Sequence, residues 1–223
     1  MNSFNIMQDS FQNFFRINHP ILQCKLTQLR DKYTERKIFS GLIEELSCFL
    51  AYEAIGNLIE RRDKVTSSMN RKEKTKITRL EDMDFTVVPV LRAGLGMVKG
   101  ILRMLPTATV GHIGFARDSE TLKPTEYYFK IPTGSHSNQY VVCDPVLGTG
   151  NTACSVLKRL KQNGIRKIVF FSIIATPLAV NKMFQENPEV PIYAISLDRG
   201  LGVQRKVVPG VGDVGERLYD VFS

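Results

Sequence analysis

Apolar residues recur along this 223-residue chain with two different spacings, one typical of helices and one of buried strands. Helical spacing comes first and predicts two helices within the first sixty residues, after an N-terminal extension over residues 1–18. The apolar positions that carry these two helices are Leu22, Leu26, Leu29, Ile38, Leu42, Leu46, Phe49 and Leu50.

Short apolar runs then alternate with helical patterns. Strands are predicted over residues 85–91, 108–117, 140–143, 167–175 and 192–197. Three helices are predicted between them: one that ends at Pro106, one that ends at Gly164 and one that begins at Pro177. Strands that alternate with helices indicate an α/β fold with a central, mainly parallel sheet flanked by helices. Pro89 removes a ladder donor and predicts a sheet edge or a bulge at that point.

Two stretches have no sustained periodicity. Residues 118–138 are polar and contain Pro124, Pro132 and Gly134, so we expect a long flexible loop there. Residues 206–220 are rich in glycine, which suits backbone recognition of a small planar ligand but equally suits a long turn. Because no internal repeat or second boundary is visible, a single domain over residues 1–223 is predicted.

Composition limits the class of protein. With 43% hydrophobic and 23% charged residues the chain resembles a soluble globular protein. Its longest apolar run, residues 168–180, is shorter than the ~20 residues of a membrane span. The N-terminus lacks the pattern of a signal peptide, so we expect a cytoplasmic protein without a membrane partner. The four cysteines show no CxxC spacing, which argues against a zinc site or a disulfide framework and favours reduced, mostly buried thiols.

The net charge of +8 is concentrated in one segment. Residues 61–79 hold eight basic side chains against Asp63 and Glu73. A run of this kind without interleaved aromatic residues is more often a solvated arm than a nucleic-acid surface. Nucleic-acid binding stays open as the alternative.

The segment CDPVLGTGNT, residues 143–152, lies between a predicted strand and a predicted helix. Ligands of parallel α/β sheets bind at the carboxyl ends of strands. Gly148 and Gly150 leave backbone N–H groups accessible, and threonines add hydroxyl donors near a helix N-terminus, so the loop can hold a phosphate. Asp144 would accept hydrogen bonds from sugar hydroxyls. The alternative is a tight turn in which Asn151 or Thr152 caps the helix.

Two arginines follow other predicted strands. LRAGLG, residues 91–96, repeats the order of strand end, glycines and helix start, with Arg92 at the turn. Arg117 ends the next strand. The arginine guanidinium can donate two hydrogen bonds at once to phosphate oxygens, and it stays charged. Two arginines at strand ends therefore suit a pyrophosphate group.

These motifs resemble the uracil phosphoribosyltransferases, a family of type I phosphoribosyltransferases. The resemblance rests on HPILQCKLTQLRD, YEA, VVPVLRAGLGM, ARDSETLKP, CDPVLGTGNT and VVPGVGDVGERLYD, which follow in order over roughly residues 19–222. It lapses mainly over residues 61–84, a divergent basic arm. It implies the type I phosphoribosyltransferase fold, with an N-terminal helical segment and a mobile hood over residues 118–133.

The activity implied by the resemblance is pyrimidine salvage: transfer of the 5-phosphoribosyl group from phosphoribosyl pyrophosphate to uracil, which gives UMP and pyrophosphate. Asp144, Arg117 and Asp213 are the residues that it implies for catalysis. For the donor it implies Arg92, Arg117, Asp144, Pro145, Val146, Leu147, Gly148, Thr149, Gly150, Asn151, Thr152 and Asp213. For uracil it implies Val207, Gly212, Asp213 and Val214.

The resemblance also implies Mg2+, bound through the donor and water rather than by protein ligands, and a homodimer or a higher homo-oligomer. It leaves open whether GTP is an effector. The chain departs from the family pattern at Asn151, where a glycine is usual, and at Lys206, where a tyrosine is usual. Two alternatives to an active enzyme therefore stay open: a non-catalytic homologue, and an RNA-binding regulator on the same scaffold.

Overall fold

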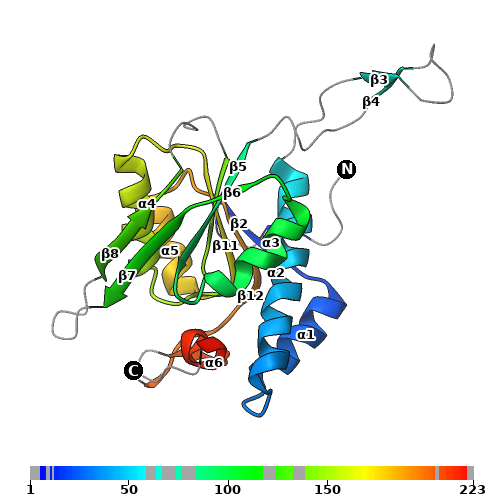
Figure 1. Ribbon diagram of the computed structural model, residues 1–223. Coiled ribbons are helices and arrows are strands. Elements are labelled where there is room, and N and C mark those ends of the chain that lie inside the picture. The colour runs from blue at the N-terminus through cyan, green and yellow to red at the C-terminus, as the bar shows by residue number, and fades with distance from the viewer. Residues whose placement is uncertain are drawn as a thin grey trace.

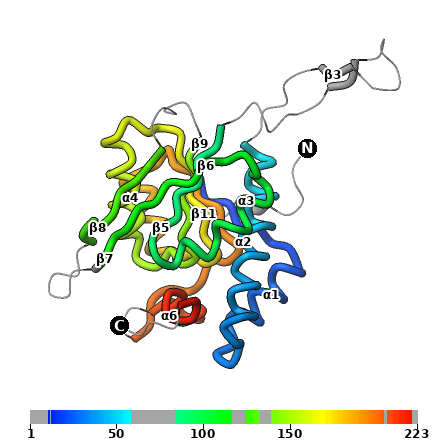
Figure 2. The backbone as a smooth tube through the Cα atoms, viewed as in Figure 1, coloured from blue at the N-terminus to red at the C-terminus, as the bar shows by residue number. Residues whose placement is uncertain are grey.

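A computed structural model describes residues 6–8, 11, 13–58, 64–66, 74–76, 84–117, 124–132, 139–203 and 206–219. For residues 6–8, 64–66, 74–76 and 117 it describes the backbone only. The described chain is built around one large sheet with helices on both of its faces (Figures 1 and 2).

The main sheet is mainly parallel, as predicted. Its strands lie in the order β1 (Ile6–Gln8), β2 (Phe14–Ile17), β12 (Ile192–Leu197), β11 (Ile168–Ala175), β9 (Gln139–Cys143), β5 (Phe85–Leu91), β7 (His112–Arg117) and β8 (Pro124–Lys130). Neighbouring strands from β2 to β7 pair in parallel. The two edge strands, β1 and β8, pair antiparallel.

The remaining strands are short and form four further pairings. β6 (Thr109–Val110) extends the ladder on β5, and β10 (Val146–Leu147) pairs with β11. β13 (Gly200–Leu201) pairs with β14 (Val207–Val208), and β3 (Lys64–Thr66) pairs with β4 (Lys74–Lys76), each as a separate antiparallel pair.

The helices divide between the two faces because successive strand residues point to opposite sides. α1 (Pro20–Arg30), α2 (Arg36–Leu58), α3 (Leu95–Met104) and the short α6 (Val214–Tyr219) share one hydrophobic cluster with Val141 and Phe171. α4 (Asn151–Gln162) and α5 (Pro177–Glu186) share the other with the neighbouring residues Val142 and Phe170. Burial on both faces explains why the central strands are continuous apolar runs.

All five predicted helices are present, but the expectation for Pro89 is wrong. β5 is an interior strand, between β9 and the pair β6 and β7. Pro89 lies where the neighbouring ladder is interrupted, between the pairings of Val87 with Val110 and of Val90 with Ile113. A residue without an N–H group fits this interruption, so neither an edge nor a bulge is needed.

Two expectations of irregular structure are also wrong in part, because β8 lies within the expected loop at 118–138 and α6 within the expected irregular C-terminal stretch. β2 lies within the N-terminal extension, where no strand was predicted. β8 was missed because it is an edge strand whose residues are mostly exposed, so no alternation of buried positions marks it. β2 and α6 are too short for a spacing to be recognised, although Phe14 and Ile17 are fully buried.

The thiols are free, as expected: Cys143 and Cys154 are buried, Cys48 is half-buried and Cys24 is exposed. Within the described ranges, no helix has both the length and the apolar character that crossing a membrane would require.

Candidate active site

A pocket of about 400 Å³ lies at the carboxyl ends of β5 and β9, where ligands of parallel α/β sheets bind. It brings together the three segments that the sequence singled out: the loop after β5, the loop after β9 and the segment after β14. The predicted site residues in its lining are Arg92, Asp144, Pro145, Val146, Gly148, Thr149, Thr152, Val207, Gly212, Asp213 and Val214. Phe115 and Lys206 also line it.

The loop at residues 144–152 leads into α4, and a glycine forms the junction between them. Gly150 is the N-cap of α4 with a positive φ of 78°, a conformation that favours glycine. Its C=O accepts the N–H of Cys154 at 2.9 Å. The alternative in which Asn151 or Thr152 caps α4 is wrong, because the cap is a glycine and supplies no side-chain bond. The positive end of α4 therefore faces a loop that carries two threonine hydroxyls.

Helix α5 braces this loop from outside the pocket. The Thr176 hydroxyl donates to the Gly148 carbonyl at 2.6 Å and accepts the N–H of Ala179 at 3.2 Å, so one side chain caps α5 and fixes the loop. Lys182 Nζ donates to Asn151 Oδ1 at 2.7 Å. The Asn151 side chain is thereby directed toward α5. Sequence reasoning missed both braces: the Thr-Pro pair signals a helix start, but nothing in it indicates the bond to Gly148.

The turn after β5 carries Arg92. The peptide bond between Leu91 and Arg92 is cis. Two residues later the chain passes so close to β9 that a Cβ on Gly94 would lie 2.5 Å from the Cys143 carbonyl oxygen, which explains the glycine. The Tyr219 hydroxyl of α6 donates to the Arg92 carbonyl at 3.3 Å. Arg92 itself is exposed and lines the pocket.

Among the predicted site residues whose positions are fully described, Leu147, Gly150 and Asn151 do not line the pocket. Arg117 ends β7, as predicted, but its side chain lies outside the described residues. Leu147 is buried within β10. Its carbonyl accepts the N–H of Thr176 at 3.1 Å, so Leu147 anchors the loop to β11.

The C-terminal side of the pocket is a turn between β14 and α6. Gly210 and Gly212 have positive φ angles of 59° and 75°. Asp213 is exposed, and its Oδ1 accepts the Glu216 N–H at 3.0 Å at the start of α6. One Asp213 carboxylate oxygen is thus engaged by α6 while the residue lines the pocket.

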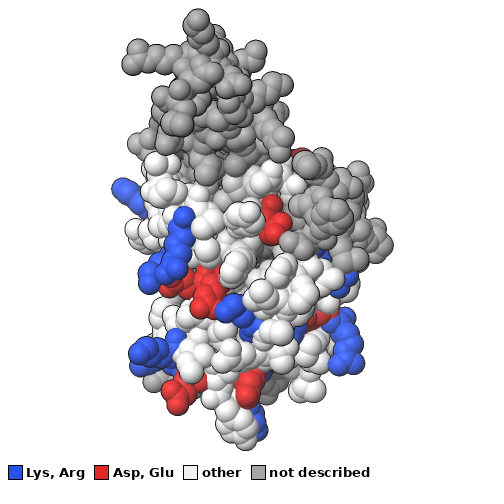
Figure 3. Space-filling model, turned by 90° about the vertical axis from the view of Figure 1, so that its right-hand side faces the viewer, with Lys and Arg blue, Asp and Glu red and all other residues white. Residues whose placement is uncertain are grey.

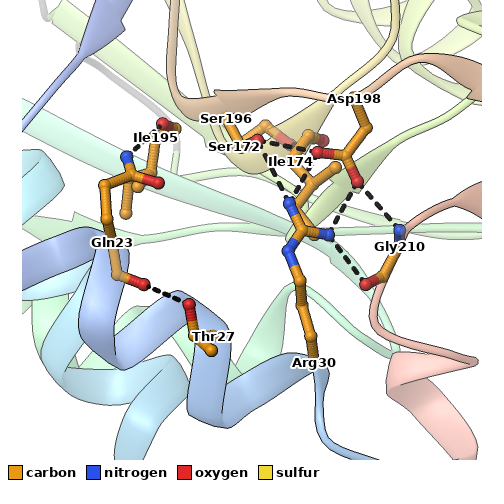
Figure 4. Close-up of polar contacts among 9 residues, drawn as sticks. All are labelled: Gln23, Thr27, Arg30, Ser172, Ile174, Ile195, Ser196, Asp198 and Gly210. Atoms are coloured by element: carbon orange, nitrogen blue, oxygen red, sulfur yellow. Dashed lines mark hydrogen bonds and ion pairs between the residues drawn. The ribbon is translucent and has the colours of Figure 1, made fainter.

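A buried ion pair holds the same turn, and it was not predicted (Figure 4). Asp198, 3% exposed, binds Arg30 through both carboxylate oxygens, at 2.6 and 2.8 Å. The Gly210 N–H donates to Asp198 at 2.9 Å and the Gly210 carbonyl accepts from Arg30 at 2.8 Å. Burial by itself raises the pKa of Asp198, but the hydrogen bonds from Arg30, Ser196 and Gly210 outweigh it and hold that pKa below its usual value. The two partners are 168 residues apart, so no sequence spacing could reveal them.

Arg217 forms a second anchor. Its guanidinium donates to the carbonyls of Leu29, at 2.8 Å, and Val211, at 2.9 Å. It also lies over the ring of Phe39, with 4.0 Å from Cζ to the ring centroid. The turn that carries Asp213 is therefore tied at two points to the end of α1.

The surface charges of the helical face do not form a continuous basic area among the residues described. Lys25 pairs with Glu45, and both Lys99 and Arg103 pair with Glu44, across the α1, α2 and α3 helices. In Figure 3 basic and acidic side chains are interspersed over the described part of one side of the molecule. Such exposed pairs contribute little to stability.

Comparison with known proteins bears on this pocket. The sequence profile of a family described as uracil phosphoribosyltransferase matches residues 16–221. A uracil phosphoribosyltransferase of Thermoanaerobacter sp. (strain X514) is 41% identical over 209 residues, 94% of this chain and 98% of that protein. One of Anoxybacillus flavithermus is 42% identical over 202 residues, 91% of this chain and 95% of its own length.

Solved structures agree. A protein from Aquifex aeolicus superposes with a TM-score of 0.81 at 30% identity, over 93% of this chain and 98% of its own. An adenine phosphoribosyltransferase from Leishmania donovani superposes with a TM-score of 0.55 over 89% of each chain. At 13% identity, the second likeness shows a shared fold only.

Proposed function

Since the chain belongs to the uracil phosphoribosyltransferase family, we propose that the pocket at the ends of β5 and β9 is where it acts. The chain is a transferase that uses phosphoribosyl pyrophosphate and uracil to form UMP in pyrimidine salvage. The observation that carries the assignment of the site is the meeting of three separate segments, around Arg92, Asp144 and Asp213, in one pocket.

The loop at residues 144–152 would hold the ribose 5′-phosphate of the donor. Donors are supplied by the backbone around Gly148 and Gly150, by the Thr149 and Thr152 hydroxyls and by the N-terminus of α4, where the Asn151 N–H donates to Thr149 Oγ1 at 3.4 Å. Asp144, at the start of this loop, would accept hydrogen bonds from the ribose hydroxyls. Its carboxylate suits hydroxyl donors better than phosphate oxygens, since like charges repel.

Arg92 and Arg117 would hold the pyrophosphate. Arg92 lines the pocket directly after the end of β5. Arg117 belongs to this proposal through its place at the end of β7, the next parallel strand. Two guanidinium groups would stabilise the negative charge that develops on the leaving pyrophosphate.

The turn after β14 would bind uracil. Val207 and Gly212 offer backbone donors and acceptors, and Val214 lies beside them in the pocket lining. A planar ring with alternating carbonyl and N–H groups matches backbone groups of this kind. Asp213 would lie between base and ribose.

The pocket suits Mg2+ that arrives on the donor. Asp144 and Asp213 are the carboxylates in its lining, and the described residues hold no group of three acidic, histidine or cysteine side chains. Mg2+ with few protein ligands is usually bound through phosphate oxygens and water. When bound, the ion would neutralise charge on the pyrophosphate.

The proposed reaction is a displacement at the ribose C1 atom. The bond from C1 to the pyrophosphate oxygen breaks and the leaving pyrophosphate takes the electron pair. The bond from C1 to the N1 atom of uracil forms with inversion at C1, and the N1 proton of uracil is released to solvent. This chemistry depends on positioning and on charge stabilisation more than on a nucleophilic side chain. The pocket lining, with two carboxylates and a guanidinium, matches that requirement.

The direct test measures UMP formation from uracil and phosphoribosyl pyrophosphate with Mg2+, beside orotate, adenine, guanine and hypoxanthine. We expect turnover with uracil alone. A folded protein that binds the donor but forms no UMP would instead be the non-catalytic homologue suggested by Asn151 and Lys206.

Replacing Asp144 by asparagine tests the ribose contact. Hydrogen bonds to charged groups contribute about 1.5–3 kcal/mol, so kcat/KM should fall by about ten- to a hundredfold. Asp84→Asn is the matched control, because Asp84 is exposed at the start of β5 and does not line the pocket. Equal kinetics in the two variants would contradict the role given to Asp144.

Membership of the family also supports proposals about assembly, location and regulation. We infer a homodimer or a higher homo-oligomer in the cytoplasm, and light scattering of the active protein would give its mass. A GTP effector is a further proposal, tested by adding GTP to the same assay.

A further inference from the structure

We propose that Arg30 and Asp198 are positioning residues for the base, which act by fixing the backbone of Gly210. The inference rests on the proposed assignment of residues 207–214 to uracil. Neither residue lines the pocket, so neither would touch the substrate.

The ion pair holds both polar groups of one residue. Asp198 accepts the Gly210 N–H, and Arg30 donates to the Gly210 carbonyl while its other nitrogen binds Asp198 and Ser196 (Figure 4). Gly210 is buried and can neither shift nor rotate without breaking one of these bonds.

Gly210 lies in a tight turn, so its fixed position determines where the neighbouring pocket residues lie. A Cβ built on Gly210 would lie 2.2 Å from the carbonyl oxygen of Val207, so the two residues are in close backbone contact. Gly210 is also three residues from Asp213. The two pocket residues on either side of the turn are therefore placed by the same fixed peptide groups.

The turn is fixed by hydrogen bonds to the C-terminal end of α1. Arg30 holds Gly210 there, and Arg217 joins the carbonyl of Leu29 to that of Val211. The loop at residues 144–152 is held by a different element, since Thr176 and Lys182 belong to the start and body of α5. The donor side and the base side of the pocket thus have separate supports. A substitution in one support should therefore change the KM of one substrate.

Arg30→Lys is the sharpest variant. It keeps the positive charge but removes the planar fork that reaches Asp198, Ser196 and Gly210 together. We expect KM for uracil to rise about tenfold, the effect of losing one hydrogen bond to a charged group, with KM for phosphoribosyl pyrophosphate and kcat changed by less than about twofold. A merely structural ion pair predicts instead a lower melting temperature with both KM values unchanged or raised together.

Ser196→Ala is the second variant and keeps the experiment decisive if Arg30→Lys does not fold. It removes one hydroxyl donor to Asp198 and leaves the ion pair in place. Because this hydroxyl bonds a carboxylate, a rise of about tenfold in KM for uracil alone is expected, the effect of losing one hydrogen bond to a charged group. An unchanged KM for uracil in this folded variant would overturn the proposal.

Lys25→Gln is the matched control on the same helix, since Lys25 pairs with Glu45 on the surface and does not line the pocket. It should leave both KM values unchanged. Failure of the proposed function would appear in the unaltered protein, as an absence of UMP. Failure of the present inference would appear only in the variants of an active enzyme.

Discussion

Asn151 stands where the family usually has glycine, at the first position of α4, and its effect depends on where its side chain points. The amide oxygen accepts from Lys182 on α5, so the side chain is turned to the outside of the phosphate loop. A residue that would crowd a phosphate if it pointed inward becomes a link between two helices. From the sequence, the side-chain direction could not be foreseen, because Lys182 is 31 residues away.

Asn151→Gly should therefore affect stability more than catalysis. We expect a loss of about 1 kcal/mol in the free energy of unfolding, from the lost hydrogen bond and the greater freedom of glycine in the unfolded chain. KM for phosphoribosyl pyrophosphate should change by less than about fivefold, which corresponds to under about 1 kcal/mol. Urea unfolding and initial rates give the two quantities.

Lys182→Met is the matched control, because it removes the same bond from the other side. The two variants should lose similar stability. A large change in KM for the donor in Asn151→Gly, without one in Lys182→Met, would show that the amide itself contacts the phosphate.

At the scale of elements, the N-terminus of α5 serves two functions through Thr176. In Thr176→Val, which keeps the shape, α5 loses its cap and the Gly148 carbonyl loses its donor. The expected loss of stability is about 2 kcal/mol, which lowers the melting temperature by about 4–8 °C in a chain of this length. KM for the donor should rise while KM for uracil does not.

Thr27→Val provides the comparison for this variant. Thr27 bonds only the Gln23 carbonyl within α1 and is exposed, so its replacement should cost less than about 0.5 kcal/mol. If both variants behaved alike, the brace between α5 and the phosphate loop would have no measurable role.

The attachment of α1 to the turn after β12 should depend on pH. Because the pKa of Asp198 is lowered in the folded protein, its carboxylate stabilises the fold fully above the unfolded pKa of about 3.9, and this contribution is lost as pH falls through the lower folded pKa. The stability difference between the unaltered protein and Asp198→Asn should therefore be large at pH 7 and shrink below about pH 4. Urea midpoints at both pH values measure it. A difference that stayed constant to pH 3 would refute the charged role of Asp198.

The same elements show what the sequence could and could not predict. Interior strands and their helices were found because burial on both faces leaves long apolar runs and helical spacings, as in β11 and α4. β8 escaped because an exposed edge strand has no such pattern. In the site, the loop at residues 144–152 was recognisable from local glycines and threonines. Thr176, which supports this loop, and Arg30, which supports the turn around Gly210, act across the fold, and no local pattern in the sequence indicates these contacts.

At the scale of the whole molecule, the two helical layers place the supports of the pocket on opposite faces of one sheet. α4 and α5 belong to the core cluster that carries the phosphate loop, while α1, α2 and α6 belong to the other, which carries the turn around Gly210. The sheet is thus the common frame, and the pocket lies at the carboxyl ends of its interior strands β5 and β9. In the proposed assignment, the 5′-phosphate loop is supported from one layer and the turn that would bind the base from the other.

The net charge also belongs to this scale, because most of it comes from residues 61–79. Replacing Arg71, Lys72, Lys74 and Lys76 by glutamine reduces the net charge from +8 and tests whether that charge takes part in function. A solvated arm predicts unchanged UMP formation, because charges farther apart than a Debye length of about 8 Å are largely screened at physiological salt. An RNA-binding regulator would behave differently: its affinity for an RNA oligonucleotide would fall with salt, with a slope of about −0.7 per phosphate contact, and the four substitutions would flatten that slope. Equal, weak RNA binding by both proteins, together with equal enzyme rates, is the result expected of a solvated arm.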